Sequence, residues 1–570
     1  MSRGLRKSLP GMLALAIVAS ATPCARAEAP KLEALFPAGG QVGSTFILDA
    51  VGKLDPDTWL WTDAPGVTLS PEGKNRKWKV EIATWARPGL YPILANNKDG
   101  ASETRWFSIG SLPEIAEKES NGSLENAQVL QQMPVCINGR LEKSEDVDGF
   151  SCKLQDGQTL VGYVEAYALG SPIDVMAHVV NEAGERVLTA SDARNLDPEI
   201  VYKAPKAGRY TVQIAGFNHP PSADVRFVAS PSIVYRLHLS NGPTVTQVLP
   251  AAVAWNGKTE VELRGYNLDA SKTRHTLEAA PLRSLGDTSL AMVPGAIRPI
   301  QVLTTEGAVG VEKEPNNTRE QATPMALGAM GGVLSDKTDV DRYAVTMKRG
   351  DRFQATVWSK QLGLPLDGLL KIEAPDGKQI TMQDDQGPVP DPMAQFGANE
   401  DGVYQVIVED LFKRGGEAMG YVLEVVRPKP EFEAKLADAK PVLLEAGKSA
   451  TLKVTVTRKN GYKEPLMVRV GNLPLGVYAE DTEVPEKGGG AVDIKLQAAA
   501  NAQAASRQIY VTVWNKAEAP LMQKAQAPLR GETMRGTSLL DFTDMLWLTV
   551  KPAAAVDSKG AAAGQAVTGK

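Results

Sequence analysis

Apolar and polar residues alternate with a period of two through much of this chain. The segments QTLVGYVEAY at 158–167, DRFQATVW at 351–358 and YQVIVED at 404–410 show this pattern. Because successive side chains of a strand point to opposite faces of a sheet, the pattern predicts strands with one buried face. Turn-forming pairs such as Asp376-Gly377 separate these segments at short intervals. We therefore predict an all-β chain, a tandem array of β-sandwich domains with Ig-like and jelly-roll-like packing.

One long segment of the chain occurs twice. EDVDGF at 145–150 matches TDVDRY at 338–343, and LGSPID at 169–174 matches LGLPLD at 362–367, both at an offset of 193 residues. The correspondence extends over about 90 residues, which indicates a duplicated domain rather than chance similarity. A weaker repeat precedes each copy, because the segment from Leu32 is similar to the one that begins at Val245.

These patterns divide the chain into seven predicted parts. They are a signal peptide at 1–27, a small β domain at 28–110, a large β-sandwich at 111–242, a second small β domain at 243–311, a second large β-sandwich at 312–428, an Ig-like β-sandwich at 429–552 and a disordered tail at 553–570.

The N-terminal residues predict export. Basic residues within 1–7 precede an apolar run at 12–21 and the small-x-small sequence at 25–27, so we expect cleavage after Ala27. A membrane anchor is the alternative, but an anchor needs about 20 apolar residues and this run is shorter. Lipidation at Cys24 is a second alternative. No later segment is apolar enough to be a transmembrane segment, so we predict a secreted protein of the periplasm or cell surface.

Composition excludes some classes of function. The chain carries 62 basic and 67 acidic residues, a net charge of −5, which gives no basic surface for nucleic acid. Its four histidines are scattered, and the sequence contains neither H-E-x-x-H nor G-x-S-x-G. We therefore expect a protein that is not an enzyme.

Two cysteines, Cys136 and Cys152, remain after removal of the signal peptide. Their counterparts in the second copy are apolar, Ala329 and Val345, so both cysteines are expected to face inward. Export favours a disulfide, which would close a loop of about 16 residues and stabilise the fold by ~3 kcal/mol. The alternative is two buried reduced thiols that pack as small apolar groups.

Two tryptophans alternate with other residues in TWLWTD at 58–63. Trp59 and Trp61 would share one face of a strand, and we expect them in the core with Trp78 and Trp85. The alternative is an exposed pair that stacks on sugar rings or anchors a partner.

The motifs of the duplicated domain resemble a known family. EPNNT at 314–318, DVDRY at 339–343, PDGK at 375–378 and DGVY at 401–404 are similar to the bacterial pre-peptidase C-terminal (PPC) domain, and the first copy carries the same series more loosely. The smaller units resemble Ig-like transcription-factor (TIG) domains, and the last unit resembles a bacterial Ig-like domain. The PPC resemblance implies a non-catalytic sandwich that is often appended to secreted peptidases, although no peptidase domain precedes either copy here.

The resemblance also implies calcium, because a related collagenase domain holds the ion between an acidic N-terminal segment and an acidic loop. Calcium takes 6 to 8 oxygen ligands. The expected ligands are Glu312, Glu314, Asn316, Asn317, Asp336, Asp339 and Asp341 in the second copy, and Glu117, Glu119, Asn121, Asp146 and Asp148 in a weaker first copy. The first copy has Gly122 in place of Asn317 and Lys143 in place of Asp336. The alternative is that these acidic residues form solvated turns.

The function expected from these features is a secreted, non-catalytic binding or scaffold protein of the cell envelope. Calcium would stiffen at least one junction of a semi-rigid rod, and the ligand would be an extracellular protein or a polysaccharide. The alternative is an exported hydrolase or an accessory subunit of a secreted peptidase. A third possibility is a structural component of the envelope that assembles with itself.

Overall fold

The computed structural model describes residues 28–73, 76–143, 145–218, 226–255, 257–278, 288–386, 389–486, 490–518, 520–528 and 542–553. Within these ranges the regular structure is β-strand except for two single 3-10 turns, so the predicted all-β class is confirmed. None of the helical turns in the described part of the chain could cross a bilayer. The expected signal peptide lies outside the described residues, as does the expected tail from residue 554 onward.

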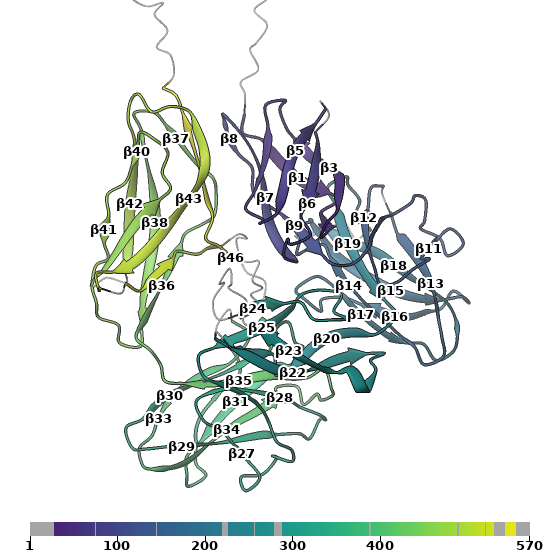
Figure 1. Ribbon diagram of the computed structural model, residues 1–570, viewed down its shortest axis with the longest axis vertical. Coiled ribbons are helices and arrows are strands. Elements are labelled where there is room, and N and C mark those ends of the chain that lie inside the picture. Colours follow the sequence, from purple (N-terminus) through teal and green to yellow (C-terminus); the bar gives the residue numbers. More distant parts are fainter. Residues whose placement is uncertain are drawn as a thin grey trace, which may run out of the picture.

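Five two-sheet sandwiches follow one another along the chain (Figure 1). Sandwich 1 spans 31–110, sandwich 2 spans 114–240, sandwich 3 spans 244–305, sandwich 4 spans 308–426 and sandwich 5 spans 431–551. Sandwich 4 begins with a strand that ends at Val311, just before the boundary expected from the sequence.

Sandwich 1 has one sheet of order β1-β3-β6-β5 and a second of order β2-β9-β7-β4, to which β8 adds at β7. Its strands are β1 (Lys31–Phe36), β2 (Gly39–Gln41), β3 (Thr45–Lys53), β4 (Trp59–Thr62), β5 (Val67–Glu72), β6 (Lys77–Ile82), β7 (Gly89–Asn97), β8 (Gly100–Ala101) and β9 (Arg105–Gly110).

Sandwiches 2 and 4 share one topology, as the repeat in the sequence predicts. Sandwich 2 pairs β10-β12-β19-β14-β17 with β11-β13-β18-β15-β16, and sandwich 4 pairs β26-β28-β35-β30-β33 with β27-β29-β34-β31-β32. The strands of sandwich 2 are β10 (Glu114–Ala116), β11 (Gln128–Val129), β12 (Val135–Arg140), β13 (Asp148–Leu154), β14 (Thr159–Glu165), β15 (Ile173–Asn181), β16 (Arg186–Ala190), β17 (Glu199–Lys203), β18 (Gly208–Asn218) and β19 (Val234–Ser240). Those of sandwich 4 are β26 (Ala308–Val311), β27 (Thr323–Pro324), β28 (Gly328–Val333), β29 (Asp341–Met347), β30 (Arg352–Trp358), β31 (Gly368–Glu373), β32 (Gln379–Gln383), β33 (Met393–Gly397), β34 (Gly402–Asp410) and β35 (Gly420–Val426), with the turn η2 (Lys360–Leu362).

Sandwich 3 is the smallest unit, with sheets β20-β22-β23 and β21-β25-β24. It consists of β20 (Thr244–Leu249), β21 (Ala252–Ala254), β22 (Lys258–Tyr266), η1 (Ala270–Lys272), β23 (Arg274–Glu278), β24 (Thr288–Ala291) and β25 (Ile300–Thr305).

Sandwich 5 pairs β36-β38-β42-β40 with a sheet that contains β37-β47-β43-β39-β41 and β44, beside a short β45-β46 ribbon. Its strands are β36 (Glu431–Leu436), β37 (Val442–Glu445), β38 (Ser449–Lys459), β39 (Leu466–Gly471), β40 (Val477–Tyr478), β41 (Thr482–Glu483), β42 (Ala491–Ala498), β43 (Ala505–Asn515), β44 (Met522–Lys524), β45 (Ala527–Pro528), β46 (Phe542–Thr543) and β47 (Leu546–Lys551).

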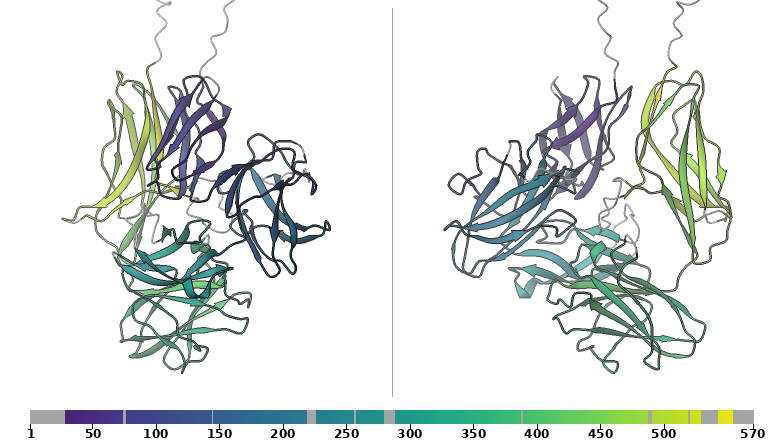
Figure 2. Two further views of the ribbon diagram at one scale, coloured as in Figure 1. Left: turned by 45° about the vertical axis from the view of Figure 1, so that its right-hand side comes forward. Right: turned by 180° about the vertical axis from the view of Figure 1, so that it is seen from behind.

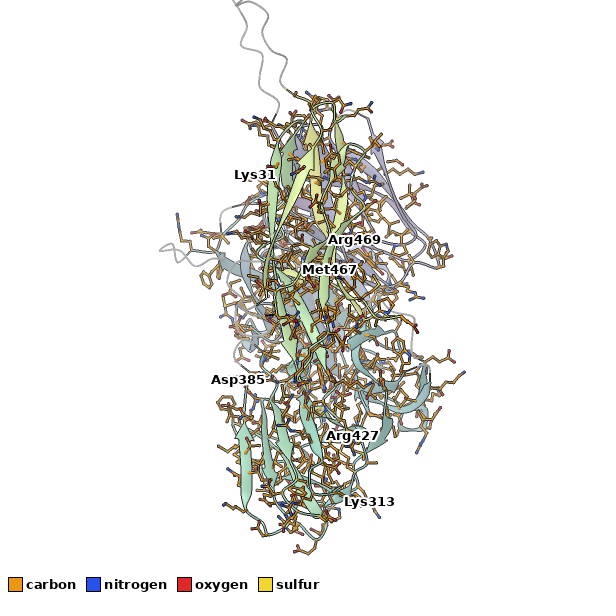
Figure 3. The ribbon with its side chains drawn as sticks, turned by 90° about the vertical axis from the view of Figure 1, so that its left-hand side faces the viewer. Lys31, Lys313, Asp385, Arg427, Met467 and Arg469 are labelled. Atoms are coloured by element: carbon orange, nitrogen blue, oxygen red, sulfur yellow. The ribbon has the colours of Figure 1, made fainter. Side chains whose placement is uncertain are left out.

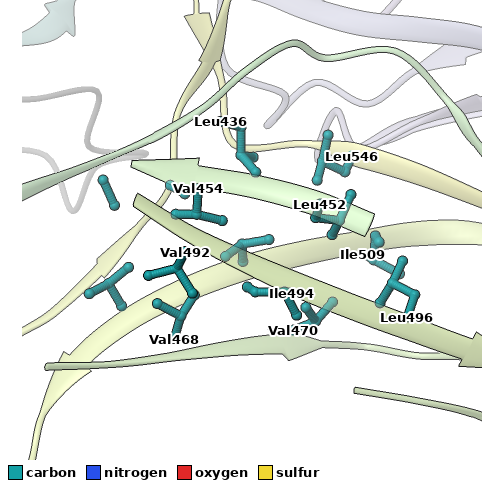
Figure 4. Packing of buried hydrophobic residues seen from close by; sticks show 14 of the residues in the cluster. Leu436, Leu452, Val454, Val468, Val470, Val492, Ile494, Leu496, Ile509 and Leu546 are labelled. Carbon is teal, nitrogen blue, oxygen red and sulfur yellow. The ribbon is translucent and has the colours of Figure 1, made fainter. Parts of the chain in front are cut away.

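The core of sandwich 5 shows why alternation builds these layers. Exposed and buried residues alternate without interruption along β42, and its inward side chains Val492, Ile494 and Leu496 pack against those of the facing sheet, such as Val468 and Val470 (Figure 4). Burial of each such side chain favours folding by roughly 1.5–3 kcal/mol, and the polar side chains between them stay in water.

The five sandwiches of the expected semi-rigid rod are not arranged in a straight line. Sandwiches 1 and 5 lie side by side, and sandwich 4 lies at the far end of the molecule (Figures 1 and 2). In Figure 3, Lys31 is near one end of the long axis and Lys313 near the other. The indole rings of Trp61 and Trp547 lie 5.1 Å apart across the contact between the first and last sandwiches, so the described chain closes on itself.

The expected disulfide is not formed, because Cys136 and Cys152 face different sides of sandwich 2. Both thiols are free and buried. Val135 and Ile137 point into the core, so the residue between them must point outward, and Cys136 packs at the junction with sandwich 3. Cys152 lies in the core itself. The prediction that both cysteines face inward was therefore wrong for Cys136.

The expected tryptophan core is also corrected. Of the four tryptophans that were expected there, only Trp78 is buried, whereas Trp59 is 50% exposed and Trp85 is 67% exposed. Leu60 occupies the inward position of β4, and Trp61 turns toward sandwich 5.

Candidate metal centres

The acidic segment that opens sandwich 4 folds back over one end of that sandwich. Glu312 follows β26, and the parallel pairing of β26 with β28 lets Glu312 Oε1 accept the N–H of Val333 at 2.7 Å. Asp341 is the first residue of β29 and is fully buried. Carboxylate oxygens of Glu312, Glu314 and Asp341 lie within 4.8 Å of one another.

Two buried tyrosines form the inner wall of this site. The Tyr343 hydroxyl donates to Glu312 Oε2 at 2.9 Å and lies 2.7 Å from the Tyr421 hydroxyl. The Tyr421 hydroxyl donates to Asp341 Oδ2. These bonds fix one oxygen of the buried Asp341 and one oxygen of the half-buried Glu312.

Two buried side-chain oxygens of this site have no hydrogen-bond partner among the described residues. Asn316 is fully buried, and its Nδ2 donates to Glu312 Oε2 at 3.3 Å. Asn316 Oδ1 and Asp341 Oδ1 are buried without a hydrogen-bond partner among the described residues. Such a group costs about 1–3 kcal/mol when it stays unsatisfied, so these two oxygens are the ones that a bound water or cation would contact. We call Glu312, Glu314, Asn316 and Asp341 the second cradle.

Sandwich 2 contains the same arrangement, the first cradle, which consists of Glu117, Glu119, Asn121 and Asp148. Carboxylate oxygens of its three acidic residues lie within 4.8 Å of one another. The Tyr235 hydroxyl donates to Asp148 Oδ2 at 2.6 Å. Asn121 and Asp148 are fully buried, and their Oδ1 atoms have no partner in the part of the chain that the structure describes. In the described ranges, the two cradles are the groups of three or more His, Cys, Asp or Glu residues with this spacing.

Burial and mutual repulsion disturb the acidity of these carboxyl groups. Burial, and then the charge of Glu312, raises the pKa of Asp341 from 3.8 to about 10. In the first cradle, burial and the charge of Asp148 raise the pKa of Glu117 to about 9, and burial raises the pKa of Asp148 to about 7. The protein alone therefore favours a protonated carboxyl in each cradle, whereas a bound cation would let all the carboxylates ionise.

Sequence reasoning missed the tyrosines and two glycines behind them. A Cβ at Gly332 would lie 2.4 Å from the Tyr421 hydroxyl and 2.7 Å from Glu312 Oε2, and a Cβ at Gly139 would lie 2.1 Å from the Tyr235 ring. The two glycines are separated by the repeat offset of 193 residues, and the two tyrosines each follow a Gly or Val that begins a strand. The repeat offset could have identified the pair of glycines, whereas the two tyrosines lie 186 residues apart and do not fit that offset.

The remaining predicted ligands lie next to the cradles, where their oxygens accept hydrogen bonds within turns. Asn317 Oδ1 accepts the Val340 N–H, Asp336 Oδ1 accepts from Thr338, Asp339 Oδ2 accepts from Ser335, and Asp146 Oδ2 accepts the N–H groups of Glu142 and Lys143. The structure thus brings together Glu312, Glu314, Asn316 and Asp341 of the second set and their four counterparts in the first.

A cysteine, a histidine and a glutamate also meet on the outer face of sandwich 2. Cys136 Sγ is 3.7 Å from His238 Nε2, and Glu165 Oε2 is 3.2 Å from the same nitrogen. A catalytic base would use one nitrogen for the nucleophile and the other for the carboxylate. Both Cys136 and His238 are also buried, and burial raises the pKa of the thiol well above its ordinary value. The group is arranged as a packed junction, not as a nucleophile with its base.

Comparison with known proteins finds partial likenesses. No family model matches the chain. A probable subtilase-type serine protease of Deinococcus radiodurans is 31% identical over 120 residues, which is 20% of this chain and 16% of the protease. Among solved structures, the pre-peptidase C-terminal domain of a collagenase from Bacillus anthracis is 18% identical, and the match covers 20% of this chain and all of that domain with a TM-score of 0.16. The surface layer protein SbsC, domains 1–6, is 9% identical over 93% of this chain and 55% of that structure, with a TM-score of 0.14.

Proposed function

We propose that this protein is a secreted, non-catalytic binding or scaffold protein of the cell envelope whose two large sandwiches each bind a calcium ion. The observation that carries the calcium proposal is the pair of unpaired buried oxygens in each cradle, Asn316 and Asp341 in one and Asn121 and Asp148 in the other. Export is supported by the N-terminal sequence described above.

The donor chemistry of the cradles fits a hard divalent cation. Each offers three carboxylates and one amide oxygen and no sulfur or imidazole, which suits calcium better than zinc. A bound calcium ion would supply positive charge among buried carboxylates and would bring no catalytic group.

The residues of each cradle come from two separate parts of the fold. Glu312, Glu314 and Asn316 belong to the segment between β26 and β27, whereas Asp341 begins β29. A cation held by both parts would tie this segment to the sandwich and stiffen that end of it. A stiffened sandwich suits a protein that presents several modest binding surfaces to an extracellular protein or polysaccharide.

The alternative, an accessory subunit of a secreted peptidase or an exported hydrolase, is favoured by one observation. The aligned segment of this chain is related to part of a subtilase-type protease, although it spans only 16% of that protein. Under this alternative the chain would bind a peptidase or its substrate. A panel of peptide and glycoside substrates separates the two proposals, since a scaffold turns over none of them.

Thermal unfolding of the chain with calcium and with chelator tests the proposed function. We expect calcium to raise the unfolding temperatures of sandwiches 2 and 4. At a calcium concentration one hundred times Kd, binding adds about 2.7 kcal/mol to the free energy of unfolding. Asp341→Asn should remove the effect in sandwich 4 and Asp148→Asn the effect in sandwich 2. Asp336→Asn, in the adjacent turn, is the matched control and should leave both intact. Equal unfolding temperatures in calcium and chelator would refute the proposal.

A further inference from the structure

The contact between the first and last sandwiches has features of a specific docking interface. An isolated sandwich buries one face of each strand, but β7 and β47 are buried on both faces. In β7, Ile93 and Ala95 enter the core of sandwich 1, and Leu94 between them is only 1% exposed. In β47, Leu546 and Leu548 enter the core of sandwich 5, and Trp547 is only 3% exposed.

The two outer faces cover each other. Trp61, Leu94 and Ala101 of sandwich 1 form one apolar cluster with Met545 and Trp547 of sandwich 5. The rings of Trp61 and Trp547 meet edge to face at 61°, a favourable geometry for two aromatic rings. We call these five residues the clasp.

An ion pair lies beside the clasp. Lys551 Nζ lies 3.2 Å from Asp99 Oδ1, and both side chains are largely shielded from solvent, at 27% and 16% exposure. An apolar centre with aromatic rings and a charged pair at its edge is the usual composition of a protein–protein interface. The contact between sandwich 5 and sandwich 1 therefore resembles an interface between two separately folded proteins.

Sandwich 5 contacts the end of sandwich 4 through exposed polar side chains. It follows sandwich 4 through the short segment 427–430, which contains two prolines. The side chains of the pair formed there by Lys429 and Glu306 are 68% and 76% exposed. Asn460 Nδ2 donates to the Lys429 carbonyl at 2.8 Å, and Gln395 Nε2 donates to Asn460 Oδ1 at 2.8 Å, both at exposed positions. Exposed polar contacts of this kind contribute little to holding a domain in place.

We propose that the clasp holds the chain closed in solution as a reversible intramolecular docking interface, and that the protein opens when sandwich 5 swings away about residues 427–430. Sandwich 5 is thus the ligand of sandwich 1. The tether raises its effective concentration, so an interface of a few side chains is occupied most of the time and still releases. Opening exposes Trp61 and Leu94 on one side and Met545 and Trp547 on the other.

Carbodiimide cross-linking of the full chain tests this proposal, because it joins a lysine to a carboxylate only when the two are in contact. We expect an intramolecular Asp99–Lys551 cross-link in monomeric protein, identified by mass spectrometry. Two pairs within single sandwiches serve as internal controls for folding, Lys53–Glu28 at 2.6 Å in sandwich 1 and Lys524–Asp544 at 2.8 Å in sandwich 5.

Two independent variants break the clasp from opposite sides. Trp547→Ala and Leu94→Lys should each lower the yield of the Asp99–Lys551 cross-link by roughly tenfold or more, as expected when a central interface residue is lost. The control cross-links should stay unchanged, and small-angle scattering should show a larger radius of gyration. Arg469→Ala, on the face of sandwich 5 that is turned to the viewer in Figure 3 and away from sandwich 1, should change neither readout.

The proposal is overturned if the unsubstituted chain forms both control cross-links but not Asp99–Lys551. It is overturned equally if both clasp variants keep the Asp99–Lys551 yield and the radius of gyration of the unsubstituted chain.

Discussion

The two large sandwiches have the same strands in the same order, yet the sheet face that each turns toward the preceding sandwich is built from different chemistry. In sandwich 2 that face is ionic. Arg236 is fully buried, donates to both oxygens of Glu114 and lies 3.4 Å from Glu165. Ser108 of sandwich 1 donates to Glu165 at 3.2 Å and completes the network across the junction.

In sandwich 4 the corresponding face is apolar. Val422 stands next to Tyr421 as Arg236 stands next to Tyr235, and it packs with Ala329 and Leu364 against the core of sandwich 3. Polar contacts also cross this junction, since Thr305 donates to Glu424 at 2.8 Å and Gln247 donates to the Glu417 carbonyl at 2.5 Å.

The cradle is the same in both copies although the junction is not. Each cradle combines carboxylates from the segment between the first two strands of its sandwich, an aspartate that begins a later strand and a tyrosine that donates to this aspartate. These residues contact one another, so few of them can change independently. The outer face need only match one neighbour, and several solutions exist. The cradle is therefore the feature that the two large sandwiches share, whereas each junction is specific to one pair of sandwiches.

The largest expected effect separates the two junctions. Arg236→Met removes the guanidinium that pairs with both Glu114 and Glu165. Loss of one partner from a buried ionic network costs about 3–5 kcal/mol. Val422→Ala, at the corresponding position of sandwich 4, should cost about 2 kcal/mol, since it removes roughly two methylene equivalents. Calorimetric unfolding of the full chain measures both, and equal costs would contradict the contrast between the junctions.

A smaller effect is expected from crowding the cradles. Gly332→Ala would push a methyl group against Tyr421 and Glu312, at a cost of about 1–3 kcal/mol, and should weaken calcium binding in sandwich 4. Gly139→Ala should do the same in sandwich 2. Gly242→Ala is the matched control, because an added Cβ there would meet nothing within 4 Å and the φ of Gly242, like those of Gly332 and Gly139, is not in the left-handed region. The cradle interpretation fails if Gly332→Ala leaves calcium binding at its original strength.

The stability of the calcium-free protein should depend on pH in a direction opposite to ordinary ion pairs. A carboxyl group with a raised pKa binds its proton more tightly in the folded chain, so its contribution is complete below the unfolded pKa and is lost as the pH rises through the folded pKa. For Asp341 this window runs from 3.8 to about 10. In chelator, sandwich 4 should therefore become less stable as the pH rises from 5 to 9.

Calcium should remove this dependence, so that its stabilising effect grows with pH. Asp341→Asn abolishes the titration and is the matched control. Unfolding temperatures measured at several pH values in chelator and in calcium test the prediction, and a calcium effect that shrinks toward high pH would contradict it.

The smallest expected effect concerns the one difference between the cradles' inner walls. Tyr343 donates to Glu312, whereas its counterpart Phe150 has no hydroxyl. Tyr343→Phe should cost about 1 kcal/mol in chelator, the net value of a hydrogen bond to a buried group. Phe150→Tyr should bring the first cradle closer to the second. Chemical denaturation resolves a change of this size, and an unchanged midpoint for Tyr343→Phe would show that the hydroxyl has no role in the apo cradle.

Local alternation in the sequence was sufficient to predict the strands and the duplicated sandwich, because each is decided by neighbouring residues. The resemblance to the PPC family, not the alternation, assigned Glu312, Glu314 and Asn316 to one site. Neither signal distinguished Asp341, whose carboxylate enters the cradle, from Asp336, whose carboxylate caps a turn, because that depends on where each strand begins.

Relations between distant elements were harder to predict. Cys136 was assigned to the wrong face because a single step along a strand reverses the side to which a side chain points. The closed arrangement did have a signal, since Trp547 places a large apolar side chain at an outward position between Leu546 and Leu548, which point inward. What covers the outer face could not be read from the segment itself.

Isothermal titration of the full chain with calcium tests the central claim most directly. The two cradles predict two calcium ions per chain, one after Asp341→Asn, one after Asp148→Asn and none after both substitutions, with Asp336→Asn unchanged at two. Binding that is absent from the unsubstituted chain, or that survives both substitutions together, would contradict the claim that the cradles are calcium sites.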